Sequence, residues 1–135
     1  MPTRWINLCL VLLTFAGCSD PDRPTLVPAT GRVTMNGQPL TAGAIIFHPG
    51  DGNPYMKDKP SSLLQLDGSF TMKTFPFGEG VSPGPYKVTL APELATRIGR
   101  PELAHLEQTP LTVDVPVTGL SDHLFVVAES TAAAR

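Results

Sequence analysis

The stretch GRVTMNG, residues 31–37, indicates the fold class of this chain. From Arg32 to Met35, polar and apolar side chains alternate, which is the period of a β-strand with one buried face. Asn36-Gly37 then supplies two residues that tolerate a positive φ, so the strand can turn back in a tight hairpin. The stretch therefore predicts a strand over 30–35 followed at once by a turn.

The same pattern recurs in short runs along the rest of the chain. The 135 residues include 15 prolines and 12 glycines, which interrupt regular elements and favour an all-β domain over a helical one. Six further strands are predicted, over residues 44–48, 62–66, 69–73, 85–90, 111–115 and 123–127. The run 44–48 is apolar enough to be a central strand.

The alternation also predicts which side chains form the core. The dipeptide Asp67-Gly68 indicates a tight turn between two strands. Phe70 and Met72 share one face of the second strand, and we expect Leu64 and Leu66 to be their neighbours on the first. All four side chains are therefore predicted to point inward.

Tyr86, Val88 and Leu90 are predicted to point inward in the same way. Residues 92–99 begin with proline just inside a helix start and end with glycine, which predicts a helix of at most two turns. The polar residues 51–60 include two prolines and are expected to form a surface loop.

Seven short strands with one apolar face each can bury those faces if two sheets pack together. The predicted fold is thus an all-β, seven-stranded antiparallel β-sandwich over residues 30–128, with an open barrel as the alternative. Residues 129–135 are small and polar and are expected to fray.

The N-terminus has the pattern of a signal peptide over residues 1–17. Arg4 precedes an apolar run over 5–16, which is shorter than the roughly 20 residues of a membrane-spanning helix. Ala16-Gly17-Cys18 then resembles a lipobox, with Phe15 where an aliphatic residue is usual. The expected outcome is cleavage before Cys18 and lipid attachment to its thiol. Plain secretion with cleavage after Ala16, or an uncleaved anchor, are the alternatives.

Lipidation agrees with the cysteine count and with the segment that follows. Cys9 lies in the expected signal peptide, so Cys18 would be the only thiol of the mature chain and no disulfide could form within it. Residues 18–29 contain three prolines and predict a flexible tether between lipid and domain. The net charge of −2, without a basic patch, argues against a nucleic-acid partner.

Several of these motifs resemble the carboxypeptidase regulatory-like domains. The resemblance rests on GRVTMNGQPL (31–40) with GAIIF (43–47), on DGSFTM (67–72) and on PGPYKVTL (83–90). The run TPLTVDV (109–115) is similar to the end of small lipoproteins from planctomycete bacteria. The resemblance implies a transthyretin-like or prealbumin-like sandwich, which in the carboxypeptidases is an accessory domain and brings no activity of its own.

No catalytic, cofactor-binding or metal-binding residue is predicted. The histidines His48, His105 and His123 lack a carboxylate or cysteine at a characteristic spacing, and His48 is expected on a solvated rim. Tyr55 and Met56 are expected to pack locally in their loop, with an exposed contact surface as the alternative. The segment Phe75-Pro76-Phe77 is expected to fold back over one end of the sandwich, with a shallow ligand groove as the alternative.

These observations predict a non-enzymatic cell-envelope lipoprotein whose sandwich is a binding or assembly module. Its membrane partner is the bilayer that holds the lipid on Cys18, at the periplasmic face or the outer membrane. Ser19, directly after the cysteine, favours the outer membrane by analogy with enterobacteria. Another envelope protein or a polysaccharide is the expected further partner. The alternatives are a carbohydrate- or peptide-binding accessory subunit of a surface enzyme complex and, third, a small hydrolase.

Overall fold

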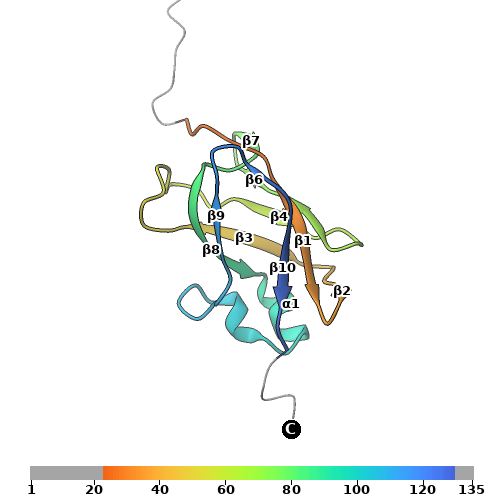
Figure 1. Ribbon diagram of the computed structural model, residues 1–135. Coiled ribbons are helices and arrows are strands. Elements are labelled where there is room, and N and C mark those ends of the chain that lie inside the picture. Colours follow the sequence, from red (N-terminus) through yellow and green to blue (C-terminus); the bar gives the residue numbers. More distant parts are fainter. Residues whose placement is uncertain (1–22, 130–135) are drawn as a thin grey trace, which may run out of the picture.

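The computed structural model describes residues 23–129, in which ten β-strands form two sheets (Figure 1). The expected signal peptide, Cys18 and residues 130–135 of the expected tail lie outside the described residues. The strands are β1 (Ala29–Met35), β2 (Gln38–Pro39), β3 (Ala44–Pro49), β4 (Ser61–Leu63), β5 (Ser69–Thr71), β6 (Lys73–Thr74), β7 (Gly78–Glu79), β8 (Gly84–Leu90), β9 (Thr112–Val115) and β10 (Leu120–Val127). The helices are α1 (Pro92–Arg97) and the 3-10 helix η1 (Pro101–Ala104).

The smaller sheet has four strands and is built around β1. β10 pairs with one edge of β1, and β2 and β5 pair with opposite ends of its other edge. β2 and β5 are antiparallel to β1, but β10 is parallel to it, so the prediction of a wholly antiparallel sandwich is wrong. β10 reaches this sheet from β9 in the other one, and no hairpin with β1 constrains its direction.

The larger sheet has six antiparallel strands in the order β7-β6-β4-β3-β8-β9. The predicted central position of β3 is confirmed. Ten strands are found where seven were expected, because β2, β6 and β7 have two residues each and are too short to show a period. The predicted strand over 69–73 is divided at Met72, where the chain passes from the smaller sheet (β5) to the larger (β6).

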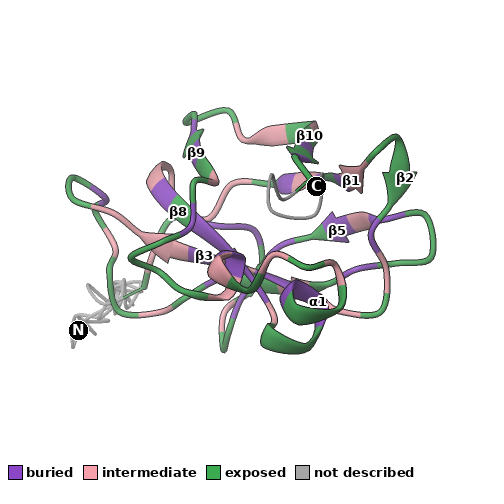
Figure 2. Cartoon of the chain, turned by 90° about the horizontal axis from the view of Figure 1, so that it is seen from below, coloured by how far each residue is buried: buried purple, intermediate pink, exposed green. Residues whose placement is uncertain are grey.

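Aromatic rings from both sheets meet in the core. Figure 2 shows buried stretches in β3, β5 and β8, which contribute to it. The ring of Phe47 in β3 lies 5.4 Å from that of Tyr86 in β8, between centroids. It lies 6.3 Å from Phe70 and 6.1 Å from Phe125, both of the smaller sheet. Such ring pairs add about 0.5–1.5 kcal/mol each beyond the burial of their area. The all-β class and the core position of Tyr86 and Phe70 are confirmed.

One predicted core residue is exposed instead. Leu64 is buried, but Leu66 is 92% exposed. The Gly68 N–H donates to the Gln65 carbonyl at 2.9 Å and the Ser69 N–H donates to Asp67 Oδ1 at 3.0 Å, so the turn extends over 65–69. Leu66 lies at the tip of this turn, where the alternation of the strand no longer applies.

Gly31 permits the close approach of β10 to β1. The register shifts between Ala29 and Gly31, and a Cβ on Gly31 would overlap with the backbone carbonyl of His123 in β10. This position needs glycine because the neighbouring backbone occupies the space of a side chain. The two-residue turn at Asn36-Gly37 has the predicted positive φ at both residues, 54° and 73°.

The two ends of the sandwich are closed differently. At one end α1 and η1 cover the core with Leu94, Ala95 and Leu103, which are almost fully buried. The predicted helix over 92–99 is thereby confirmed, and no helix of residues 23–129 is long and apolar enough to cross a membrane. At the other end Val27 forms an isolated bridge with Val81, through hydrogen bonds of 2.8 and 2.9 Å. The expected tether is therefore held to the sandwich from Val27 onward.

Candidate binding groove

A groove of about 520 Å³ opens on the flank of the sandwich. Its volume falls within the range of small-molecule sites, about 300–1,000 Å³. The strands β4, β5, β6 and β7, with the turns beside them, contribute its lining: Ser61, Ser62, Leu63, Gln65, Thr71, Lys73, Phe75 and Glu79. Figure 1 shows β4, β6 and β7 together toward the end where the described chain begins.

The groove lies where the chain changes sheets. β5 pairs with β1, whereas β6 follows after one residue and pairs with β4, so β4 and β5 cannot continue one ladder. The Ser62 hydroxyl bridges their backbones instead. It accepts a hydrogen bond from the Thr71 N–H at 3.1 Å and donates one to the Leu63 carbonyl at 2.8 Å. A side chain thus takes the place of backbone pairing at the floor of the groove.

The rim combines apolar and charged side chains. Phe75 is 85% exposed and Leu63 is 72% exposed. Lys73 is the Cα partner of Glu79 on one side and of Ser61 on the other. Because directly paired residues project from the same face of a sheet, these three polar side chains form a row on the outer face.

The two phenylalanines of the β6–β7 turn have different surroundings. Phe77 packs edge-on against Tyr55, with ring centroids 6.2 Å apart, and the Tyr55 hydroxyl donates to Asp58 at 2.6 Å. The expected packing is therefore confirmed for Phe77 and Tyr55. It is wrong for Phe75, which follows the buried Thr74 and precedes Pro76 through a cis peptide bond. Phe75 points away from the core because the inward position is already taken by Thr74.

The groove offers the chemistry of non-covalent binding. The Phe75 ring and Leu63 supply apolar surface, while hydroxyl, amide, ammonium and carboxylate groups supply hydrogen-bond donors and acceptors. The eight lining residues include no histidine or cysteine. Ser61 and Lys73 face each other, but both are exposed, whereas a lysine that activates a serine must be desolvated.

His48 is less solvated than expected. Its Nε2 lies 2.7 Å from Thr89 Oγ1, and its Nδ1 is buried without a hydrogen-bond partner among the described residues. Burial, with the charge of Lys59 as a lesser cause, lowers the pKa of His48 from its ordinary value of 6.5. The neutral imidazole is therefore the form that this site favours.

The three histidines lie on separate elements. His105 follows η1 and is exposed, while His123 in β10 packs against the Phe125 ring with centroids 4.6 Å apart. Among residues 23–129, no three histidine, cysteine, aspartate or glutamate side chains come close enough to hold a metal ion. Cys18, the single site residue expected from the sequence, lies outside the described residues.

Comparisons with protein-family models, curated proteins and solved structures give no match for this chain. Of the groove lining, only Phe75 was singled out from the sequence. The sequence did not single out Leu63, Lys73 and Glu79, because these residues come together only where the chain leaves the smaller sheet at β6. The one local signal was the proline beside Phe75, which favours a turn.

Proposed function

We propose that this chain is a non-enzymatic cell-envelope lipoprotein, anchored through Cys18, whose β-sandwich is a binding module. The observation that carries the binding role is the groove between β4 and β7, where Phe75, 85% exposed, lies beside hydroxyl, amide and charged groups. An exposed aromatic ring over polar groups is typical of a recognition surface.

The resemblance to carboxypeptidase regulatory-like domains extends the proposal to the finer fold. Three features agree with a transthyretin-like sandwich: the Asn36-Gly37 hairpin, the Asp67-Gly68 turn and the strand around Tyr86. The Tyr86 hydroxyl donates to the Ser82 carbonyl at 2.6 Å, an arrangement that resembles the tyrosine corner of β-sandwiches.

Among ligand classes, the groove favours a carbohydrate, as in the accessory-subunit alternative. A sugar ring presents one apolar C–H face, which can stack on the Phe75 ring, and hydroxyls that Gln65, Lys73 and Glu79 can bind. The partner in this case is an envelope polysaccharide.

The anchoring is tested by fractionating cells that produce the full chain. Cys18→Ala should release the protein from the membrane fraction, because the thiol that carries the lipid is lost. Cys9→Ala is the matched control, since this cysteine lies in the expected signal peptide, and it should leave the distribution unchanged. A Cys18→Ala protein that stays in the membrane fraction would contradict the anchoring.

The groove is tested by sedimentation of the protein with purified cell-wall polysaccharide. Phe75→Ala should weaken binding by about two- to tenfold, the loss expected when a stacked ring worth about 0.5–1.5 kcal/mol is removed. Leu66→Ala is the control, because Leu66 is 92% exposed and lies outside the groove lining. Equal binding by both variants and the unmodified protein would refute a role for the groove.

A further inference from the structure

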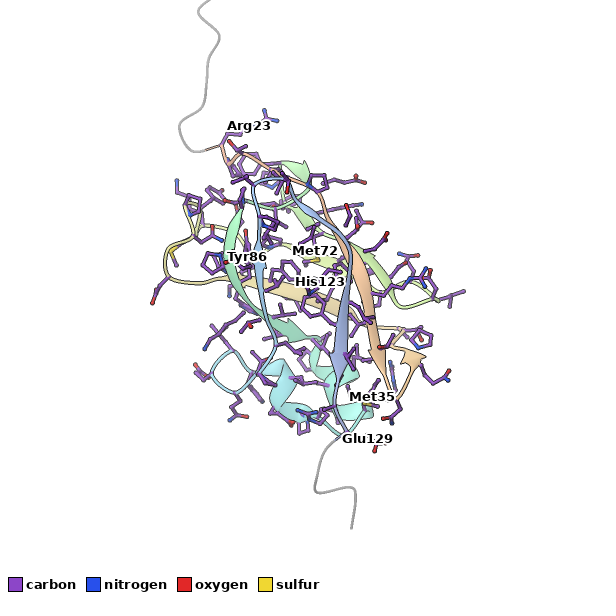
Figure 3. The ribbon with its side chains drawn as sticks, in the orientation of Figure 1. Arg23, Met35, Met72, Tyr86, His123 and Glu129 are labelled. Carbon is purple, nitrogen blue, oxygen red and sulfur yellow. The ribbon has the colours of Figure 1, made fainter. Side chains whose placement is uncertain are left out.

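The end of the sandwich where the expected tether joins the domain carries a hollow and exposed apolar side chains. Arg23 lies at this end and Glu129 at the opposite one (Figure 3). The segment that enters here is fixed, because Val27 and Val81 exchange two backbone hydrogen bonds. Whatever holds the chain before Arg23 therefore holds this end of the domain.

Three further segments meet the tether at this end. A hollow of about 460 Å³ is lined by Arg23, Pro24, Thr25, Pro54, Tyr55, Ser82, Pro83 and Val117. It brings together the loop over 50–60, the start of β8 and the turn between β9 and β10. We call these loops, with residues 23–26, the tether end.

Apolar side chains of the tether end point to solvent. Val117 is 79% exposed between the exposed Pro116 and Thr118, and Met56 is 56% exposed in the loop over 50–60. Val117 lines the hollow and Met56 directly follows Tyr55, which also lines it, so both exposed apolar side chains lie at the same end of the domain.

The length of the chain before Arg23 decides what that partner is. Cys18 and Arg23 are five positions apart, so the lipidated cysteine and the first described residue can be separated by at most about 18 Å. Val117 and Arg23 line the same hollow. A short tether keeps this surface beside the bilayer, and it converts a weak contact into an intramolecular one at a high effective concentration.

The charges at the tether end do not favour binding to an anionic surface. The sequence places Arg23, Lys57 and Lys59 at the tether end against Asp51 and Asp58, and Asp20 and Asp22 lie in the tether itself. The charges nearly cancel, so anionic headgroups gain little by approaching. The exposed apolar side chains remain as the source of affinity.

We infer that the tether end docks on the lipid surface of the membrane that holds Cys18, with Val117 and Met56 inserted at the boundary of headgroups and acyl chains. The inference rests on the proposed lipidation. It means that the domain does not swing freely on its lipid but stands on the membrane with α1 and η1 pointing away. The groove on its flank then opens sideways, parallel to the bilayer.

Tryptophan reporters test this orientation. The only tryptophan is Trp5, in the expected signal peptide, so Val117→Trp and Leu106→Trp would each give the mature chain a single fluorophore. Leu106 follows η1 at the far end and is 40% exposed. The acylated proteins are reconstituted in phosphatidylcholine vesicles with brominated acyl chains, which quench a tryptophan near the acyl region. Val117→Trp should lose at least about half of its fluorescence and Leu106→Trp almost none, with the same result in 0.5 M salt.

Equal quenching of the two reporters in acylated protein would overturn the inference and leave the proposed function standing. Quenching of Val117→Trp that disappears at high salt would overturn the apolar contact. Mass spectrometry of the same samples shows whether Cys18 carries lipid; a mature chain without it would overturn the proposed anchoring and the inference together.

Discussion

The two ends of the sandwich use opposite means of closure. At the far end the chain covers the core with apolar side chains from α1 and η1, among them Leu94 and Leu103. At the tether end, polar side chains hold the loops through hydrogen bonds to backbone carbonyls. Asn53 Nδ2 donates to the Pro85 carbonyl at 3.2 Å, and the Tyr86 hydroxyl donates to the Ser82 carbonyl. Apolar side chains such as Val117 remain outside.

Because of this difference, the side chains that stabilise the fold at the far end are not of the same kind as those exposed for contact at the tether end. Covering a core with leucines contributes about 1.5–3 kcal/mol for each side chain, whereas a hydrogen bond contributes about 0.5–1.5 kcal/mol. We therefore expect the loss of a buried leucine from the far end to cost more folding free energy than the loss of one such hydrogen bond from the tether end. The exposed apolar side chains of the tether end contribute little to the stability of the fold. They are therefore available for the proposed contact with a membrane.

The largest effect is expected at the far end. Leu94→Ala should lower the free energy of unfolding by about 2–5 kcal/mol, because Leu94 is fully buried and its loss leaves a cavity. Urea denaturation measures this change, with Leu106→Ala as the exposed control from the same end. A loss below about 1 kcal/mol would show that the helices do not seal the core.

A smaller effect is expected at the tether end, from the hydrogen bond that closes it. Tyr86→Phe should cost about 1–2 kcal/mol, since the buried Ser82 carbonyl loses the donor at 2.6 Å. Burial also raises the pKa of Tyr86, so its phenol remains a donor at neutral pH. If Tyr86→Phe were as costly as Leu94→Ala in the same urea assay, the contrast between the ends would fail.

A pH effect is expected from His48, on the outer face of the larger sheet before the loop over 50–60. Its lowered pKa means that the unfolded chain takes up a proton at a higher pH than the folded chain. Stability should therefore fall as the pH drops below 6.5 toward the lowered value, and be unaffected by this group at higher pH. His48→Gln should flatten that part of the stability curve.

The smallest effect is expected from the exposed residue of the tether end. Val117→Ser should change the free energy of unfolding by less than about 0.5 kcal/mol, because the side chain is 79% exposed. The same variant should weaken the membrane contact in a quenching assay with Met56→Trp as reporter. A large loss of stability would place Val117 in the fold rather than on a contact surface.

The strands could be predicted because their signal is local. Alternation of period two located β1, β3, β8 and β9 to within one or two residues, and it identified Phe70, Met72 and Tyr86 as buried. The direction of β10 could not be predicted, because a crossing between sheets leaves no local mark. The prediction that Leu66 is buried was wrong for a related reason, because the turn over 65–69 begins earlier than the apolar pattern indicated.

The groove could be predicted only in part. Phe75 was visible as an aromatic residue beside proline, but its exposure depends on Thr74 occupying the inward position. The remaining lining depends on β5 and β6 belonging to different sheets, which follows from pairing between distant residues. The local hydrophobic pattern does not encode such pairings.

The most direct test of the account is mass spectrometry of the N-terminal peptide of the mature protein, purified from membranes. The account predicts a chain that begins at Cys18 and carries a diacylglycerol on its thiol. A chain that begins at Gly17 with an unmodified Cys18 would contradict the anchoring, and with it the orientation of the tether end toward the bilayer.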